Sequence, residues 1–189
     1  MSNALILHGT GGYPTENWFD WLRQELDALG CATAVPQLPG SDKPNLRRYN
    51  HFLLDELKYD FNEQTILIGH SSGAVAILGL LQALPDDVRV DTCYLVGSFK
   101  DDLGWEALCE LFDPALDLAA IKNKAKHFVF IHADNDPYCP LEHAEFLAKE
   151  LGGELIVKEG QKHFSVGTMG EGYRTFPFLL DLIKERNLS

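Results

Sequence analysis

The sequence is poor in basic residues, and this shortage excludes several classes of partner. Its 16 Lys and Arg against 28 Asp and Glu give a formal net charge of -12. Nucleic acids and anionic membranes are bound by clustered Lys and Arg. The only basic cluster in the sequence is the pair Arg47-Arg48. We therefore expect neither a nucleic acid nor a membrane as a partner.

Long apolar runs and closely spaced cysteines are also lacking. No apolar run approaches the ~20 residues that cross a bilayer. The first residues, MSNALILHG, lack the positive lead and long apolar core of a secretion signal. The four cysteines form no CxxC pair, so free thiols in a reducing compartment are favoured over disulfides. These absences predict a cytoplasmic protein.

What is present is a chain of 189 residues, 46% of them hydrophobic, without a linker-like or repetitive segment. We expect one domain over residues 1–189, large enough for a substantial core. Short apolar runs predict strands over 4–8, 31–35, 65–69, 90–98, 127–133 and 154–159. Helical periodicity predicts helices over 18–29, 46–61, 72–84, 144–151 and 176–183, with a less regular helical excursion over 99–126.

The alternation of strands and helices predicts an α/β fold with a mostly parallel sheet covered by helices on both faces. The strands are continuously apolar, as is typical of strands buried on both faces. Ligands of such sheets bind beyond the carboxyl ends of the strands. Functional residues should therefore follow the strands directly.

The segment Gly69-His70-Ser71-Ser72-Gly73 interrupts an apolar run between a predicted strand and a predicted helix. It matches the G-x-S-x-G nucleophile elbow in the context that this motif requires. Small residues two before and two after the serine would let strand and helix approach closely. We interpret Ser71 as a nucleophile, whereas a glycine-bearing turn without chemistry is the alternative.

A nucleophilic serine needs a base, and the chain offers seven histidines. His163 lies in the loop that follows the last predicted strand and is the best-placed general base. The group that orients its imidazole could be Asp134 or Asp136, since both follow the strand over 127–133. The order Ser, Asp, His is that of α/β-hydrolases.

An oxyanion hole is expected after the first strand, at His8-Gly9-Thr10-Gly11-Gly12. The predicted donors are the backbone amide of Ser72 and that of Thr10 or Gly11. A phosphate-binding loop is the rival interpretation, but neither GxxxxGK[ST] nor G-x-G-x-x-G spacing occurs here.

With these motifs, the chain resembles a compact α/β-hydrolase family of serine hydrolases similar to YdeN and to retinoblastoma-binding protein nine. The resemblance rests on the HG turn after the first strand, GHSSGA, NDPYCP and the KHF segment near the end. It implies that Ser71 is the nucleophile, Asp136 the acid and His163 the base. It also implies a fold without the first antiparallel strands of larger hydrolases and without a large lid. One departure is Lys162, which occupies a position where the family usually has glycine.

The predicted function is hydrolysis of small acyl esters or thioesters through an acyl-enzyme, without cofactor or metal. Metal-site motifs are lacking, although His132, Asp134 and Asp136 lie close in sequence. The alternative is a protein-binding module on a hydrolase scaffold, since family members are also thought to bind other proteins. Residues 99–126 are expected mainly to pack on the core, with partial covering of the site left open. Tyr13 and Trp18 are expected to line a shallow pocket.

Overall fold

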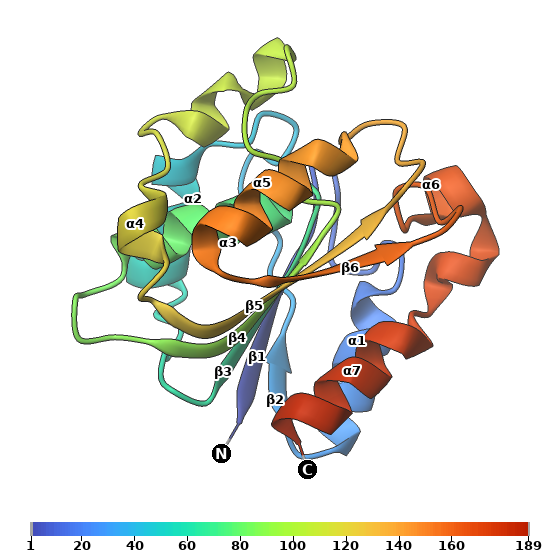
Figure 1. Ribbon diagram of the computed structural model, residues 1–189. Coiled ribbons are helices and arrows are strands. Elements are labelled where there is room, and N and C mark those ends of the chain that lie inside the picture. Colours follow the sequence, from blue (N-terminus) through green and yellow to red (C-terminus); the bar gives the residue numbers. More distant parts are fainter. Residues whose placement is uncertain (1, 189) are drawn as a thin grey trace.

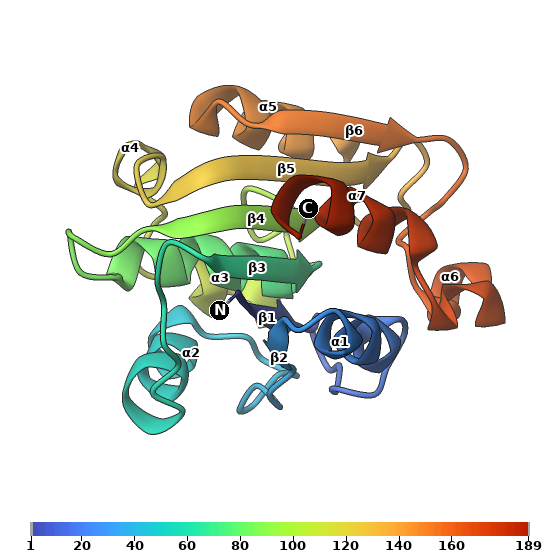
Figure 2. The same ribbon diagram turned by 90° about the horizontal axis from the view of Figure 1, so that it is seen from below.

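A six-stranded, fully parallel sheet runs through the centre of the protein (Figure 1). The computed structural model describes residues 2–188. The strand order is β2-β1-β3-β4-β5-β6, and Figure 2 shows the strands side by side in this order. The strands are β1 (Asn3–Leu7), β2 (Ala32–Ala34), β3 (Thr65–His70), β4 (Val90–Val96), β5 (Ala125–Ala133) and β6 (Glu154–Lys158). The predicted α/β fold is confirmed.

Helices cover both faces of the sheet, as Figure 1 shows. One face carries α2 (Leu46–His51), α3 (Ser72–Ala83), α4 (Leu118–Ile121) and α5 (Leu141–Leu151), with the π-helical turn η1 (Phe52–Glu56) and the 3₁₀ segment η2 (Glu106–Phe112). The other carries α1 (Phe19–Ala28), α6 (Val166–Met169), η3 (Glu171–Arg174) and α7 (Pro177–Asn187). None of the helices in residues 2–188 has the length and apolar character that a bilayer crossing requires.

The two faces divide the core as strand geometry requires. Successive strand side chains point to opposite faces, so Leu67 of β3 packs in one apolar cluster and Ile68 in the other. Every residue of β3 is buried, which confirms the expectation drawn from its continuous apolar run. The register places Gly69 beside Leu7 of β1 and Leu95 of β4. The segments that follow β1, β3 and β4 therefore meet at one edge of the sheet.

The helix expected over 46–61 is shorter than predicted. It runs through α2 and the π-helical turn η1 and ends at Glu56. Lys58 has a φ of 50°, which breaks the helical path. Phe61 nevertheless packs on the core, with its ring centroid 5.0 Å from that of Tyr59. The helical spacing of apolar residues thus identified residues that pack inward. Phe61, the last of these residues, is placed by tertiary contacts and not by a continued helix.

Residues 99–126 contain only two short helical segments, η2 and α4. Leu108 and Leu111 of η2 are buried in the core cluster of that face. This excursion is therefore anchored to the core, and it also contributes to the cavity described below.

Candidate active site

Ser71 occupies a strained turn between β3 and α3. Its backbone has a φ of 56° and a ψ of -126°, and its N–H donates to the Val96 carbonyl oxygen at 2.8 Å. A Cβ added at Gly69 would lie 2.5 Å from the Ala74 Cα, and one at Gly73 would lie 2.2 Å from the Leu7 carbonyl oxygen. Both positions therefore require glycine, as expected where a strand and a helix approach this closely. Strained backbone of this kind persists where the surroundings hold it.

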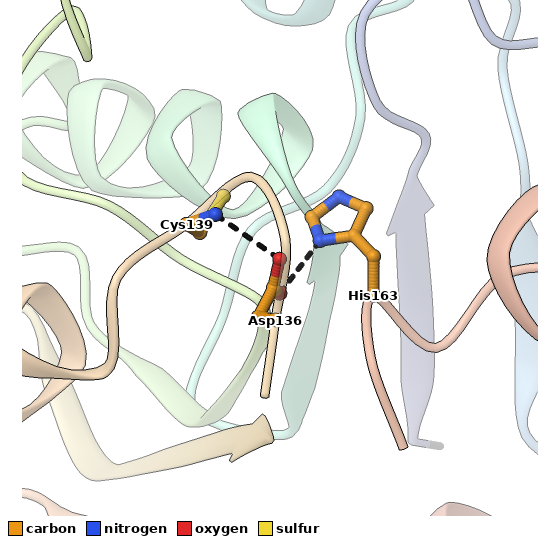
Figure 3. A group of neighbouring side chains, drawn as sticks. All are labelled: Asp136, Cys139 and His163. Carbon is orange, nitrogen blue, oxygen red and sulfur yellow. Dashed lines mark hydrogen bonds and ion pairs between the residues drawn. The ribbon is translucent and has the colours of Figure 1, made fainter. Parts of the chain in front are cut away.

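His163 lies in the loop after β6 and forms a hydrogen bond with Asp136 (Figure 3). The distance from His163 Nδ1 to Asp136 Oδ2 is 2.7 Å. The other carboxylate oxygen of Asp136 accepts the backbone amides of Tyr138 and Cys139 at 2.9 and 3.0 Å. Burial by itself would raise the pKa of Asp136, but the hydrogen bond and charge of His163 and the two amides outweigh it, so this pKa is lowered. Asp136 is thus held as a carboxylate against the imidazole.

Asp134 has a different place. Its Oδ1 accepts the Gly160 amide at 2.8 Å, and neighbouring Asn135 accepts the Lys162 amide at the same distance. Both side chains therefore brace the loop that carries His163. Of the two aspartates left open by spacing alone, only Asp136 contacts the imidazole.

A cavity of about 340 Å³ lies over Ser71 and His163 at the carboxyl edge of the sheet. It is lined by Gly9, Thr10, Glu16, Asn17, His70, Ser71, Phe99, Leu103, Trp105, Leu108, Tyr138, Cys139, His163 and Ser165. No hydrogen bond joins the side chains of Ser71 and His163 within residues 2–188. Such bonds are often long in ligand-free enzymes and tighten when substrate binds.

The walls of the cavity differ in character. Phe99, Leu103 and Trp105 of the excursion form an apolar wall, so this segment both packs on the core and borders the site. Glu16 lies among the polar lining residues, and burial raises the pKa of its carboxyl despite the opposing effects of the Tyr13 amide and Arg174.

The expectation that Tyr13 and Trp18 line the pocket is wrong. Trp18 is completely buried, and its indole N–H donates to the Phe164 carbonyl oxygen at 3.0 Å. Tyr13 is exposed outside the cavity. Aromatic character and proximity to the HG turn did not reveal that the chain turns Trp18 into the core beneath the site.

The loop after β1 limits the choice of oxyanion donors. The Gly11 amide donates to the Ser41 carbonyl oxygen at 2.7 Å, so in this conformation it is not free to bind an oxyanion. Ser72 begins α3, where amides have no partner within the helix. The Thr10 hydroxyl donates to the Ser72 hydroxyl at 2.9 Å and ties the two segments together. Of the predicted donors, this leaves the amides of Thr10 and Ser72.

Comparison with known proteins places the chain in a family. Residues 4–185 match the serine hydrolase family model. The chain belongs to the serine hydrolase family. It is 28% identical over 184 residues to the putative hydrolase YdeN of Bacillus subtilis, covering 95% of this chain and 93% of that protein. It is 27% identical over 168 residues to the serine hydrolase RBBP9 of Rattus norvegicus, covering 86% of this chain and 87% of that protein.

Solved structures agree in fold. The crystal structure of the B. subtilis ydeN gene product superposes with a TM-score of 0.89 at 26% identity, covering 98% of both chains. Est1E from Butyrivibrio proteoclasticus, solved with ferulic acid bound, superposes with a TM-score of 0.70 at 16% identity, covering 97% of this chain and 90% of that one. At that identity the second comparison shows the fold alone. The protein is therefore a hydrolase with an α/β-hydrolase fold.

Lys162 of this serine hydrolase occupies a left-handed position. Lys162 has a φ of 47°, in the region that glycine adopts without strain. Glycine would adopt this backbone conformation more readily than lysine. Lys162 holds the conformation with hydrogen bonds at both ends, since its amide donates to Asn135 and its ammonium to the Thr168 carbonyl oxygen at 3.3 Å.

Three side chains of the hydrolase could offer ligand atoms to a metal. Those of Asp136, Cys139 and His163 lie within 4.8 Å of one another (Figure 3). However, both oxygens of Asp136 already accept hydrogen bonds, and burial raises the pKa of the Cys139 thiol, which favours its protonated form. These contacts suit an aspartate–histidine pair better than a set of metal ligands. His132 is directed elsewhere and donates to the Cys139 carbonyl oxygen at 2.8 Å.

The contact that His70 makes with the His163 loop was not predicted from the sequence, where His70 is simply part of the G-x-S-x-G segment. Its Nε2–H donates to the His163 carbonyl oxygen at 2.8 Å. Its place beside Ser71 was a signal that it lies near the site. Nothing in the local pattern indicated its partner, which lies 93 residues further along the chain.

Proposed function

We propose that this hydrolase cleaves small acyl esters or thioesters through an acyl-enzyme formed on Ser71. The observation that carries the proposal is the 2.7 Å hydrogen bond between His163 and the buried Asp136 carboxylate, in a cavity that Ser71 also lines. An imidazole held in this way presents its second nitrogen as a base, which a serine nucleophile requires.

Each predicted residue has a defined role in the proposed reaction. His163 Nε2 takes the hydroxyl proton of Ser71 as Oγ attacks the acyl carbon. Asp136 keeps the remaining imidazole proton on Nδ1 and stabilises the imidazolium that forms. His163 then protonates the leaving alcohol or thiol, and water attacks the acyl-enzyme by the same steps.

The amides of Thr10 and Ser72 are the proposed oxyanion donors. They belong to segments that follow β1 and β3, which are adjacent strands of the sheet. Removing one oxyanion donor in other hydrolases costs about 2.7–4 kcal/mol of transition-state stabilisation. The Thr10–Ser72 hydroxyl contact at 2.9 Å supports this assignment, because it keeps the two segments together.

Cavity size and charge support a small, uncharged substrate. The volume of about 340 Å³ lies at the small end of the ~300–1,000 Å³ range of ligand sites. No lysine or arginine is among the described residues that line it, whereas Glu16 is. An anionic acyl group would therefore lack a counter-charge in this cavity.

The deciding experiment compares Ser71→Ala with Ser72→Ala. Fluorophosphonate labelling and hydrolysis of model esters should be lost in Ser71→Ala, with kcat falling by up to ~10⁶-fold. Ser72→Ala removes the hydroxyl that accepts from Thr10 but keeps both the Ser71 nucleophile and the Ser72 amide, so it should still be labelled and should lose far less activity than Ser71→Ala.

Two outcomes would contradict the proposal. Labelling and activity that persist in Ser71→Ala but vanish in Ser72→Ala would overturn the elbow assignment. A folded wild-type protein that neither binds the probe nor turns over any ester or thioester would favour the binding-module alternative.

A further inference from the structure

The loop that carries His163 is strained on both sides of the imidazole. Lys162 and Phe164, the residues before and after His163, have φ values of 47° and 50°. Left-handed conformations of residues other than glycine cost of order 1–3 kcal/mol each and persist only where the surroundings impose them. Something outside the loop must therefore hold it.

Two buried side chains from other parts of the fold donate hydrogen bonds to consecutive carbonyl groups of this loop. His70, the last residue of β3, donates from Nε2 to the His163 carbonyl oxygen at 2.8 Å. Trp18, directly before α1, donates from its indole N–H to the Phe164 carbonyl oxygen at 3.0 Å. Both donors lie in the core, so each bond is shielded from water.

The His70 ring has a single role open to it in this environment. Burial, together with nearby His163, lowers the pKa of His70 to about 3, so the ring is neutral. Because a carbonyl oxygen can only accept, the single ring proton lies on Nε2. Three aromatic rings surround it. Trp18 packs edge-on with its ring centroid 6.1 Å from that of His70, and the ring centroids of Phe19 and His163 lie 5.8 and 4.7 Å away. The orientation of the donor is therefore set on several sides.

We propose that His70, assisted by Trp18, is a positioning residue that holds the backbone of His163 where its imidazole can serve both Asp136 and Ser71. The proposal rests on the proposed function of the Ser71 site. Because His70 directly precedes Ser71, one short segment would carry the nucleophile and fix the backbone of the base. Without its Nε2–H, the strained loop would relax and carry the imidazole away from the serine.

The test separates the ring of His70 from its hydrogen bond. His70→Phe keeps an aromatic ring and removes the donor, whereas His70→Gln keeps an N–H donor and removes the ring. Phe19→Leu is the matched control, because Phe19 packs on the same ring but forms no side-chain hydrogen bond with the loop. Three quantities are measured: kcat per active site titrated with fluorophosphonate, KM, and the downfield ¹H resonance of the His163 Nδ1–H bonded to Asp136.

His70→Phe should lower kcat per titrated site by about 10- to 100-fold with KM within threefold, since misplacing a catalytic group by ~1 Å costs up to ~10²-fold. The downfield resonance of this variant should broaden or vanish. In His70→Gln the resonance should reappear, and kcat per titrated site should return to within about fivefold of wild type. Phe19→Leu should be less stable but should keep the wild-type kcat per titrated site and the wild-type resonance. Trp18→Phe should change both readouts in the same direction as His70→Phe, and it serves as the test if His70→Phe does not fold.

A His70→Phe protein with wild-type kcat per site and an unchanged resonance would overturn the proposal. Equal losses of kcat per site and of the resonance in His70→Phe, His70→Gln and Phe19→Leu would also overturn the proposal, because packing alone would then explain them. The resonance requires no turnover. An inactive wild-type protein whose resonance still depends on His70 would contradict the proposed function and leave the positioning role intact.

Discussion

Replacing Asp136 by Asn tests the proposed chemistry with almost no change of shape. The Asp136 side chain is completely buried and uses one oxygen for the amides of Tyr138 and Cys139, the other for His163. Asparagine has a single acceptor oxygen. Because the two amides can only donate, that oxygen should face them at the present 2.9 and 3.0 Å, and the NH₂ group should face His163.

This arrangement sets the size of the effect. Facing an N–H donor, His163 Nδ1 must accept, so the imidazole proton moves to Nε2 and points toward Ser71. The base then offers the serine a proton instead of a lone pair. We expect kcat to fall by something approaching ~10⁴-fold, about 5.4 kcal/mol of transition-state stabilisation. Folding should be little affected, since the two amides keep their acceptor.

The assay is kcat on a short p-nitrophenyl ester, normalised to folded protein by circular dichroism and thermal melting. Asp134→Asn is the matched control, because its remaining oxygen can still accept the Gly160 amide and it does not touch His163. Its kcat should stay within about threefold of wild type, less than 1 kcal/mol. If Asp136→Asn stayed within tenfold of wild type while Asp134→Asn lost activity, the assigned acid would be wrong.

Three further outcomes are expected. Across p-nitrophenyl esters from acetate to palmitate, kcat/KM should peak at short chains, because the cavity of about 340 Å³ leaves little room to bury further methylenes at ~0.8 kcal/mol each; a steady rise through palmitate would indicate a lipase. In denaturant titrations, the free energy of unfolding of Lys162→Gly should stay within ~1 kcal/mol of wild type. That of Lys162→Val should fall by about 1–2 kcal/mol, because a β-branched residue tolerates a left-handed backbone poorly. Equal stability of the two variants would contradict the strain at this position. Finally, the folded-state pKa of His70, about 3, lies below its ordinary 6.5, so its contribution to stability is complete above pH 6.5 and is lost as pH falls toward 3. The stability difference between wild type and His70→Gln should therefore shrink by up to ~1.4 kcal/mol per pH unit in that window, and a flat difference would show that His70 is not held neutral.

The order of elements could be predicted from the sequence because it depends on local periodicity. Apolar runs marked the six strands, and their alternation with helical periods led to a parallel sheet. The tight turn at Ser71 was recognisable because Gly69 and Gly73 meet a steric requirement that no larger residue satisfies. The end of the second predicted helix was missed, since Lys58 breaks it through a backbone conformation that apolar spacing does not report.

The candidate site divides in the same way. Ser71, His163 and a nearby aspartate follow strands, so topology alone brings them to one edge of the sheet. Spacing could not choose between Asp134 and Asp136, which lie two residues apart; resemblance favoured Asp136, and the turn of the loop brings its carboxylate to 2.7 Å from His163.

Other features depended on tertiary structure alone. The Gly11 amide is occupied by Ser41, and the His163 backbone is held by His70. Trp18 lies in the core rather than on the pocket wall. Each of these depends on a partner far away in the chain. Sequence thus determined which chemistry-bearing residues follow the strands, because that depends on local pattern. Tertiary structure decided which atoms remain free or held, because that depends on contacts made only when the chain is folded.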